Sequence, residues 1–131
     1  MSANFECGKW ENKGRISYWA IHLMKLCLLE QYAPDLKGDY EFMLKNIYSE
    51  HSNAIWRRTL HELKKRGLAG VKQFVQCYDC GDKWTRKQAR QVARAMEGLE
   101  IGDHGHFTPM LEEIRQCFIY AKKNRAKVES Y

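Results

Sequence analysis

The sequence has little of what marks a disordered, membrane-spanning or disulfide-built chain. Its 131 residues include only two prolines and no low-complexity tract, which argues against long disorder. No apolar run is long enough to span a bilayer, so no membrane partner is expected. The first ten residues lack the basic-then-apolar pattern of a signal peptide, and we therefore expect a cytoplasmic protein. The five cysteines are an odd number, which argues against a complete disulfide framework.

What is present fits a single globular domain over residues 1–131 whose charge is unevenly placed. A chain of this length can bury about two-thirds of its unfolded surface without disulfides. Residues 51–94 contain 11 Lys and Arg against 3 Asp and Glu, whereas the rest of the chain contains 11 against 13. The whole positive excess therefore lies in one third of the sequence. This placement favours a polyphosphate partner, although a basic face that only aids solubility gives the same pattern.

The hydrophobic pattern predicts a mainly α-helical protein with one small β-hairpin. Val71–Tyr78 is rich in β-forming residues and predicts a strand, with a turn over Asp79–Asp82 and a short return strand at Lys83–Trp84. Residues 1–14 are expected to form an irregular arm. Helices are predicted over residues 15–32, 39–50, 54–66, 85–97 and 109–128.

Several residues are expected to set the ends of these helices. Pro34 ends the first helix, and Asp39 caps the start of the second. Thr85 and Gln88 have the spacing of a capping box. The last helix ends in a basic segment around Lys122–Lys127, which we expect to fray.

The predicted 54–66 helix separates apolar and basic residues onto opposite faces. Arg57, His61 and Lys65 follow one another at a spacing of four, with Arg58 and Lys64 beside them. Ser52 or Asn53 is expected to cap its start. The opposite face carries Ile55, Trp56, Thr59, Leu60 and Leu63.

The order of a helix pair, a basic helix and a hairpin resembles the winged helix-turn-helix of small bacterial and phage DNA-binding regulators. The residues that carry the resemblance are the helix 39–50, the turn Ser49–Asn53, and the pattern Thr59-Leu60-x-x-Leu63-x-x-Arg66-Gly67-Leu68 before the predicted strand. The resemblance implies a winged-helix core over residues 15–98, flanked by the arm and by a loop and helix at 99–131. It implies a transcriptional regulator that is not an enzyme and that inserts the 54–66 helix into the major groove of double-stranded DNA.

The resemblance also implies which side chains meet the DNA. Residues at the start of the 54–66 helix would face base edges, while lysines farther along it and residues of the wing would reach phosphates. The implied DNA-binding residues are Ser52, Asn53, Arg57, Arg58, His61, Lys64, Lys65, Lys72, Lys83, Arg86 and Lys87.

A Cys-x-x-Cys turn at Cys77 and Cys80 offers half of a tetrahedral zinc site. His104 and His106 are candidates for the other two ligands, and Cys7 is a possible substitute. We therefore predict one structural zinc ion, against the alternative of two thiols with no metal.

Two alternative functions and one question of oligomeric state stay open at this stage. The fold could serve as a protein-interaction module, such as a phage or host inhibitor. The segment Asp103–His106 faintly resembles a metal-dependent nuclease, although the surrounding strand pattern is poor. A homodimer could form through the helices 15–32 and 109–128. Apolar residues in excess of one core face support the dimer: Trp19, Ile21, Leu26 and Leu29. Packing within the monomer is the alternative, but we favour the dimer because two modules that read paired half-sites bind more tightly.

Overall fold

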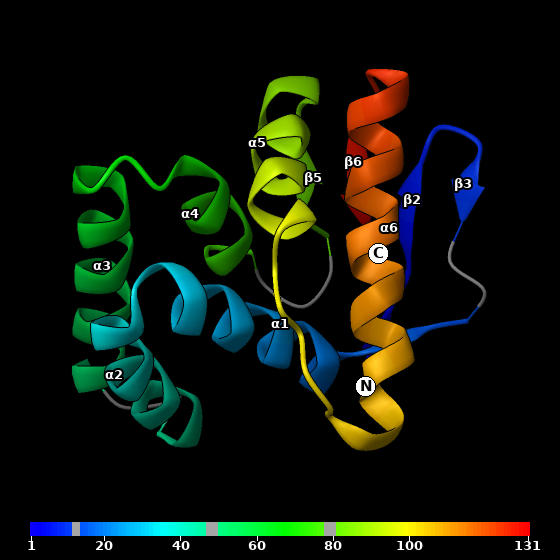
Figure 1. Ribbon diagram of the computed structural model, residues 1–131. Coiled ribbons are helices and arrows are strands. Elements are labelled where there is room, and N and C mark those ends of the chain that lie inside the picture. The colour runs from blue at the N-terminus through cyan, green and yellow to red at the C-terminus, as the bar shows by residue number, and fades with distance from the viewer. Residues whose placement is uncertain (12–13, 47–49, 78–80) are drawn as a thin grey trace.

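The computed structural model describes residues 1–11, 14–46, 50–77 and 81–131, and these form a mainly helical protein with a small antiparallel sheet (Figure 1). This confirms the predicted class of mainly α with a small β part. The helices are α1 (Tyr18–Tyr32), α2 (Pro34–Lys45), α3 (Glu50–Lys65), α4 (Ala69–Val75), α5 (Arg86–Glu97) and α6 (Thr108–Asn124), with a 3-10 turn at Gly105–Phe107. None of the helices in these ranges combines the length and the apolar character needed to cross a membrane.

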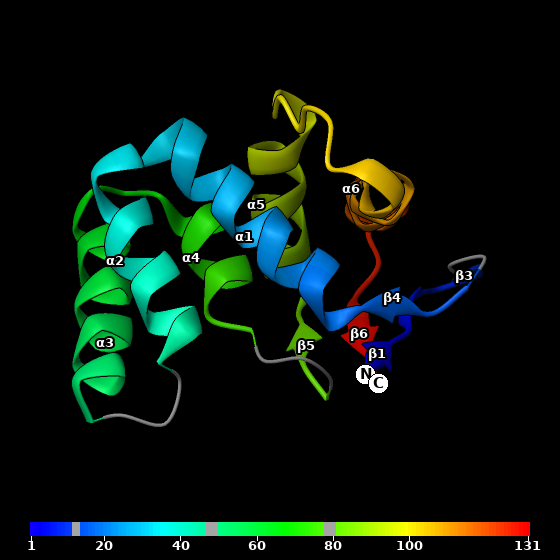
Figure 2. The ribbon, with the colours of Figure 1, turned by 90° about the horizontal axis from the view of Figure 1, so that it is seen from below.

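The sheet joins the two ends of the chain. Strand β2 pairs with both β3 and β6, and Phe5 lies opposite Ser130. Strand β5 closes the other edge by pairing with β6, and a separate two-stranded ladder joins β1 to β4. Figure 2 shows the two termini side by side beneath this sheet. The strands are β1 (Ser2–Ala3), β2 (Phe5–Cys7), β3 (Trp10–Glu11), β4 (Ile16–Ser17), β5 (Lys83–Trp84) and β6 (Val128–Ser130).

Two predictions about the chain ends are therefore wrong. Residues 1–14 include three strands rather than only an irregular arm, and the last helix ends at Asn124 instead of residue 128, which lies in β6. Phe5 and Val128 are both buried in the core. Strands of two or three residues give almost no alternating pattern in a sequence, and these strands depend on partners at the far end of the chain.

The predicted strand Val71–Tyr78 is also wrong, since Ala69–Val75 forms helix α4 and Tyr78 lies outside the described residues. Val71, Phe74 and Val75 are all buried, and their spacing of three and four places them on one helical face. Strand β5 pairs with β6 rather than with this segment. The hairpin expected at this point therefore does not form from the described residues.

Helix boundaries were predicted with mixed success. Helix α1 ends at Tyr32 as expected, but α2 begins at Pro34, so Asp39 lies inside α2 instead of capping it. Proline suits the first turn because the amide that it lacks would have no partner there. Helix α3 likewise begins at Glu50, ahead of its expected caps at Ser52 and Asn53. The capping box of α5 is confirmed: the Gln88 amide donates to the Thr85 hydroxyl at 3.2 Å.

Helix α1 is apolar nearly all round because it lies in the middle of the protein. It packs against α2, α4 and α6, and Figure 2 shows it crossing the centre of the molecule. Ile21 and Leu29 are buried in this packing, and Leu26 is half-buried. Of the four side chains assigned to a dimer surface, Trp19 is exposed, at 49%. Packing within the monomer thus accounts for most of the apolar excess.

An aromatic cluster joins the sheet to the helices. Trp84 of β5 stacks on Phe5 of β2 at a ring separation of 6.0 Å and meets the edge of Phe118 of α6 at 5.1 Å. Phe74 of α4 stacks on the same indole at 6.2 Å. The indole nitrogen of Trp84 donates to the Gln73 carbonyl at 3.0 Å, so burial leaves its polar atom satisfied. This cluster packs α4 and α6 against strands β2 and β5.

Candidate nucleic-acid interface

Helix α3 has one face in the core and one in solvent. Ile55, Thr59 and Leu63 are buried, as the sequence predicted. Among the described elements α3 packs chiefly on α2 and α4, and Figure 1 shows it at the outer edge of the molecule. The opposite face presents Asn53, Arg57, Arg58, His61, Lys64 and Lys65, all of them exposed. The predicted separation of apolar and basic faces is therefore confirmed.

Two arginines near this face are held by acidic residues of α2. Arg66, which follows α3, donates two hydrogen bonds to the Asp35 carboxylate at 2.7 and 2.6 Å, and Arg58 reaches Asp39 at 3.0 Å. The hydrogen bonds from Arg66 lower the pKa of Asp35. Both arginines fix α3 against α2, and their charge is partly neutralised.

The other basic side chains of the α3 face have no ion-pair partner among the residues that the structure describes. Arg57, Lys64 and Lys65 form no ion pair with any described residue, and His61 lies between them at helical spacing. These four side chains make up what we call the α3 basic face. Ion pairing would lower the attraction of such a face for an anion, so their freedom leaves the full charge available to a partner.

Other residues implied in DNA binding lie elsewhere. Ser52 is 2% exposed, and its hydroxyl donates a hydrogen bond to the Asn46 carbonyl, so it lies off the exposed face of α3. Lys72 lies on α4, half-buried, with its ammonium 3.2 Å from the Gln76 side chain. Lys83 is exposed on β5. Arg86 and Lys87 are exposed on α5, which Figure 1 shows apart from α3, with α4 between them.

The predicted zinc ligands are only partly described. Cys80 lies outside the described residues, and Cys77 is buried at the end of α4, where its carbonyl accepts from the buried Lys25. His106 is exposed and lies against the Phe107 ring. Within the described ranges, no three His, Cys, Asp or Glu side chains gather as a metal site would require. The zinc ion stays a prediction.

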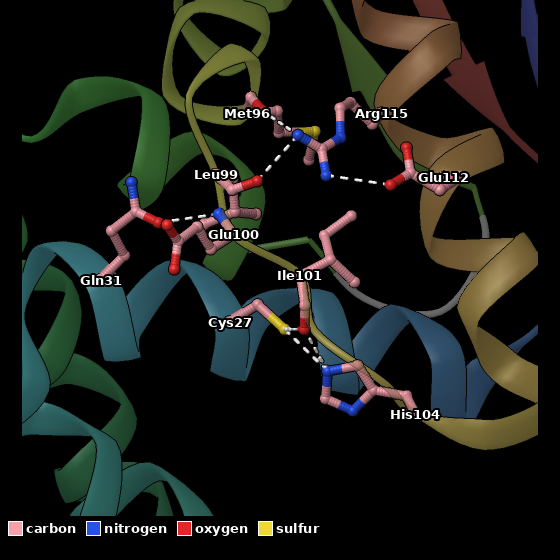
Figure 3. Close-up of polar contacts among 9 residues, drawn as sticks. All are labelled: Cys27, Gln31, Met96, Leu99, Glu100, Ile101, His104, Glu112 and Arg115. Atoms are coloured by element: carbon pink, nitrogen blue, oxygen red, sulfur yellow. Dashed lines mark hydrogen bonds and ion pairs between the residues drawn. The ribbon is translucent and has the colours of Figure 1, made fainter.

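His104, the other predicted ligand, lies beside Cys27 of α1 (Figure 3). Its Nε2 is 2.6 Å from the Ile101 carbonyl and 3.4 Å from the Cys27 sulfur. A carbonyl can only accept, so Nε2 carries a hydrogen and donates it. The same nitrogen cannot then accept the thiol proton, and burial raises the pKa of Cys27. The pair therefore lacks the base that a cysteine nucleophile needs.

The contacts around His104 instead hold the loop between α5 and α6. Arg115 donates to the carbonyls of Met96 and Leu99 at 3.2 and 2.8 Å, and so satisfies the end of α5. Gln31 of α1 accepts from the Glu100 amide at 2.9 Å, as Figure 3 shows. The sequence does not predict these contacts, because the residues that make them come from α1, α6 and the loop, and no local pattern links them.

No protein-family model, curated protein or solved structure matches this chain. The resemblance to winged-helix regulators therefore rests on the residue pattern alone, and the function has to be argued from the α3 basic face.

Proposed function

We propose that the protein binds double-stranded DNA by placing α3 in the major groove, as a small transcriptional regulator does. The observation that carries this proposal is the α3 basic face. Arg57, Lys64 and Lys65 are exposed and have no ion-pair partner in the described part of the chain, on a helix whose other face is buried. A helix at the edge of a fold can enter a groove about 12 Å wide, and free cations along it meet the phosphates on either side.

The arrangement of α2 and α3 supports a helix-turn-helix without the predicted wing strand. The two helices pack together, and the ion pairs Arg58–Asp39 and Arg66–Asp35 link α3 and the residue that follows it to α2. A recognition helix has to be rigid, because a mobile one loses entropy when it binds. Helix α4 follows where the wing would begin, so the proposed contact is made by α3 itself.

Within this interface the side chains divide by chemistry. Asn53 and Arg57, near the start of α3, are exposed and suit adenine and guanine edges, respectively. Lys64 and Lys65, in its last turn, suit phosphates, which carry no sequence information. Loss of a lysine should therefore weaken binding to all duplexes, whereas loss of Asn53 should change sequence preference.

The test compares how tightly two triple variants bind a labelled random duplex, with fluorescence anisotropy as the measure of binding. One combines Arg57→Gln, Lys64→Gln and Lys65→Gln on the α3 basic face. The matched control combines Lys9→Gln, Lys123→Gln and Lys127→Gln, three exposed lysines outside α3 that lose the same charge. We expect the first variant to bind at least about tenfold more weakly, and the control to change little.

Equal weakening in both variants would show that only total charge matters and would contradict a role for α3. Failure of the wild-type chain to bind any duplex at low salt would refute DNA binding altogether. In that case the exposed face of α3 would be better tested against protein partners.

A further inference from the structure

A second group of cations lines a groove between α5 and α6. The groove has a volume of about 480 Å³, and both helices contribute to its walls. Figure 1 shows the start of α5 and the end of α6 next to each other, since the two helices run in opposite directions. Lys122 is paired with Glu97 at 2.6 Å, but the other cations form no ion pair with a described residue. The lining residues are Arg86, Lys87, Arg90, Ala121, Lys122 and Arg125.

The first turn of α5 places positive charge where a helix tolerates it least. Arg86 and Lys87 occupy this turn, and no acidic residue accompanies them. The exposed amides at a helix start carry partial positive charge, so cations there are repelled and anions are attracted. A bound anion would offset this repulsion.

The end of α6 departs from the ordinary pattern at the same groove. Arg125 has φ +51° and ψ +48°, and within the described residues it is the one non-glycine with positive φ. Glycine is the usual residue in this left-handed conformation at a helix end. An arginine in this strained conformation, on the wall of a basic groove, suggests that its side chain has a role there.

We propose that this α5–α6 groove binds clustered phosphates, such as those of an oligophosphate anion. Two helices bring four positive charges to one groove, and none of the four has an ion-pair partner among the described residues: Arg86, Lys87, Arg90 and Arg125. Guanidinium groups bind phosphate oxygens through paired hydrogen bonds, and the volume lies within the range of small-ligand sites. The phosphates can belong to a free oligophosphate or to a nucleic-acid backbone. The proposal does not depend on DNA binding by α3.

The test is calorimetric titration of the full chain with inorganic tripolyphosphate, for the wild type and three variants. Arg125→Gly removes the side chain and leaves a residue that accepts the left-handed backbone, so the melting temperature should not fall. Arg90→Gln removes a second wall residue. We expect each to bind tripolyphosphate about tenfold more weakly. The control Lys45→Gln removes the same charge from the exposed last turn of α2, outside both basic surfaces, and should bind as tightly as the wild type.

Absence of tripolyphosphate binding by the wild type would overturn the proposal. So would wild-type affinity in both Arg90→Gln and Arg125→Gly. Repeating the titration with a saturating short duplex identifies the source of the phosphates. Competition would assign the groove to the nucleic-acid backbone, and simultaneous binding would assign it to a free oligophosphate. If the duplex does not bind, the function proposed for α3 fails while tripolyphosphate binding still stands.

Discussion

Replacing Gly70 by alanine tests the fold at the point where sequence and structure disagree most. Gly70 lies in α4, and a Cβ added there would be 2.1 Å from the Gln91 carbonyl oxygen and 3.1 Å from the Ala95 Cβ, both in α5. An ordinary contact needs more than 3 Å, so α4 would have to move away from α5. Such overpacking costs about 3 kcal/mol, while alanine in a helix recovers about 1 kcal/mol of backbone propensity. We expect a net loss of about 2 kcal/mol.

Gly38 supplies the matched control. It lies in the interior of α2, where a Cβ would meet nothing within 4 Å. The same substitution should therefore stabilise the protein by about 0.5–1 kcal/mol. Urea unfolding, monitored by circular dichroism, measures the change in unfolding free energy for both variants. In thermal unfolding, Gly70→Ala should lower the melting temperature by about 8 °C. If Gly70→Ala stabilises the protein as much as Gly38→Ala, α4 does not pack on α5 as described, and the argument for a helix in place of the wing strand fails.

Three further predictions address single groups. The pKa of Asp35 is lowered in the folded protein by hydrogen bonds from Arg66, so its stabilising effect is present above the unfolded pKa of about 3.9 and is lost as the pH falls through the folded value. The difference in unfolding free energy between wild type and Asp35→Asn should thus be constant from pH 5 to 7 and shrink below pH 4; a pH-independent difference contradicts the pairing. Burial raises the pKa of Cys7 to about 11 and also raises that of Cys117, so native protein at pH 8 should leave both unalkylated by iodoacetamide in peptide mass mapping, whereas rates equal to those in guanidinium would show that they are accessible. The predicted zinc site requires that purified wild-type protein contain one zinc ion and that Cys80→Ser lack it, as measured by metal analysis. Wild-type protein without bound metal would refute the zinc prediction.

Many of the helices could be predicted because local residue patterns determine them. The split of α3 into buried Leu63 and exposed Lys65 follows from a period of 3.6 residues, and the structure confirms it. The capping box at Thr85 also depends on residues only three apart, and it forms as expected. Patterns of this kind require no knowledge of distant partners.

The errors arose where distant partners decide the structure. Val71, Phe74 and Val75 are good β formers, but burial against α5 and the aromatic cluster makes them helical. Phe5 could not be assigned to a strand because its neighbour in the sheet is Ser130. The contacts of His104 with Cys27 and Ile101 likewise have no counterpart in its local sequence pattern. The groove between α5 and α6 likewise joins residues more than thirty positions apart.

The most direct test of the proposed function is the salt dependence of duplex binding. Each phosphate neutralised by a cation contributes about −0.9 to the slope of log K against log salt, so Arg57, Lys64 and Lys65 together predict about −2.7. Raising the salt from 50 to 200 mM should then weaken wild-type binding by about 40-fold. The triple glutamine variant of the α3 basic face should show a slope that is shallower than the wild-type slope by about 2.7. An unchanged slope in the variant would contradict DNA binding by α3.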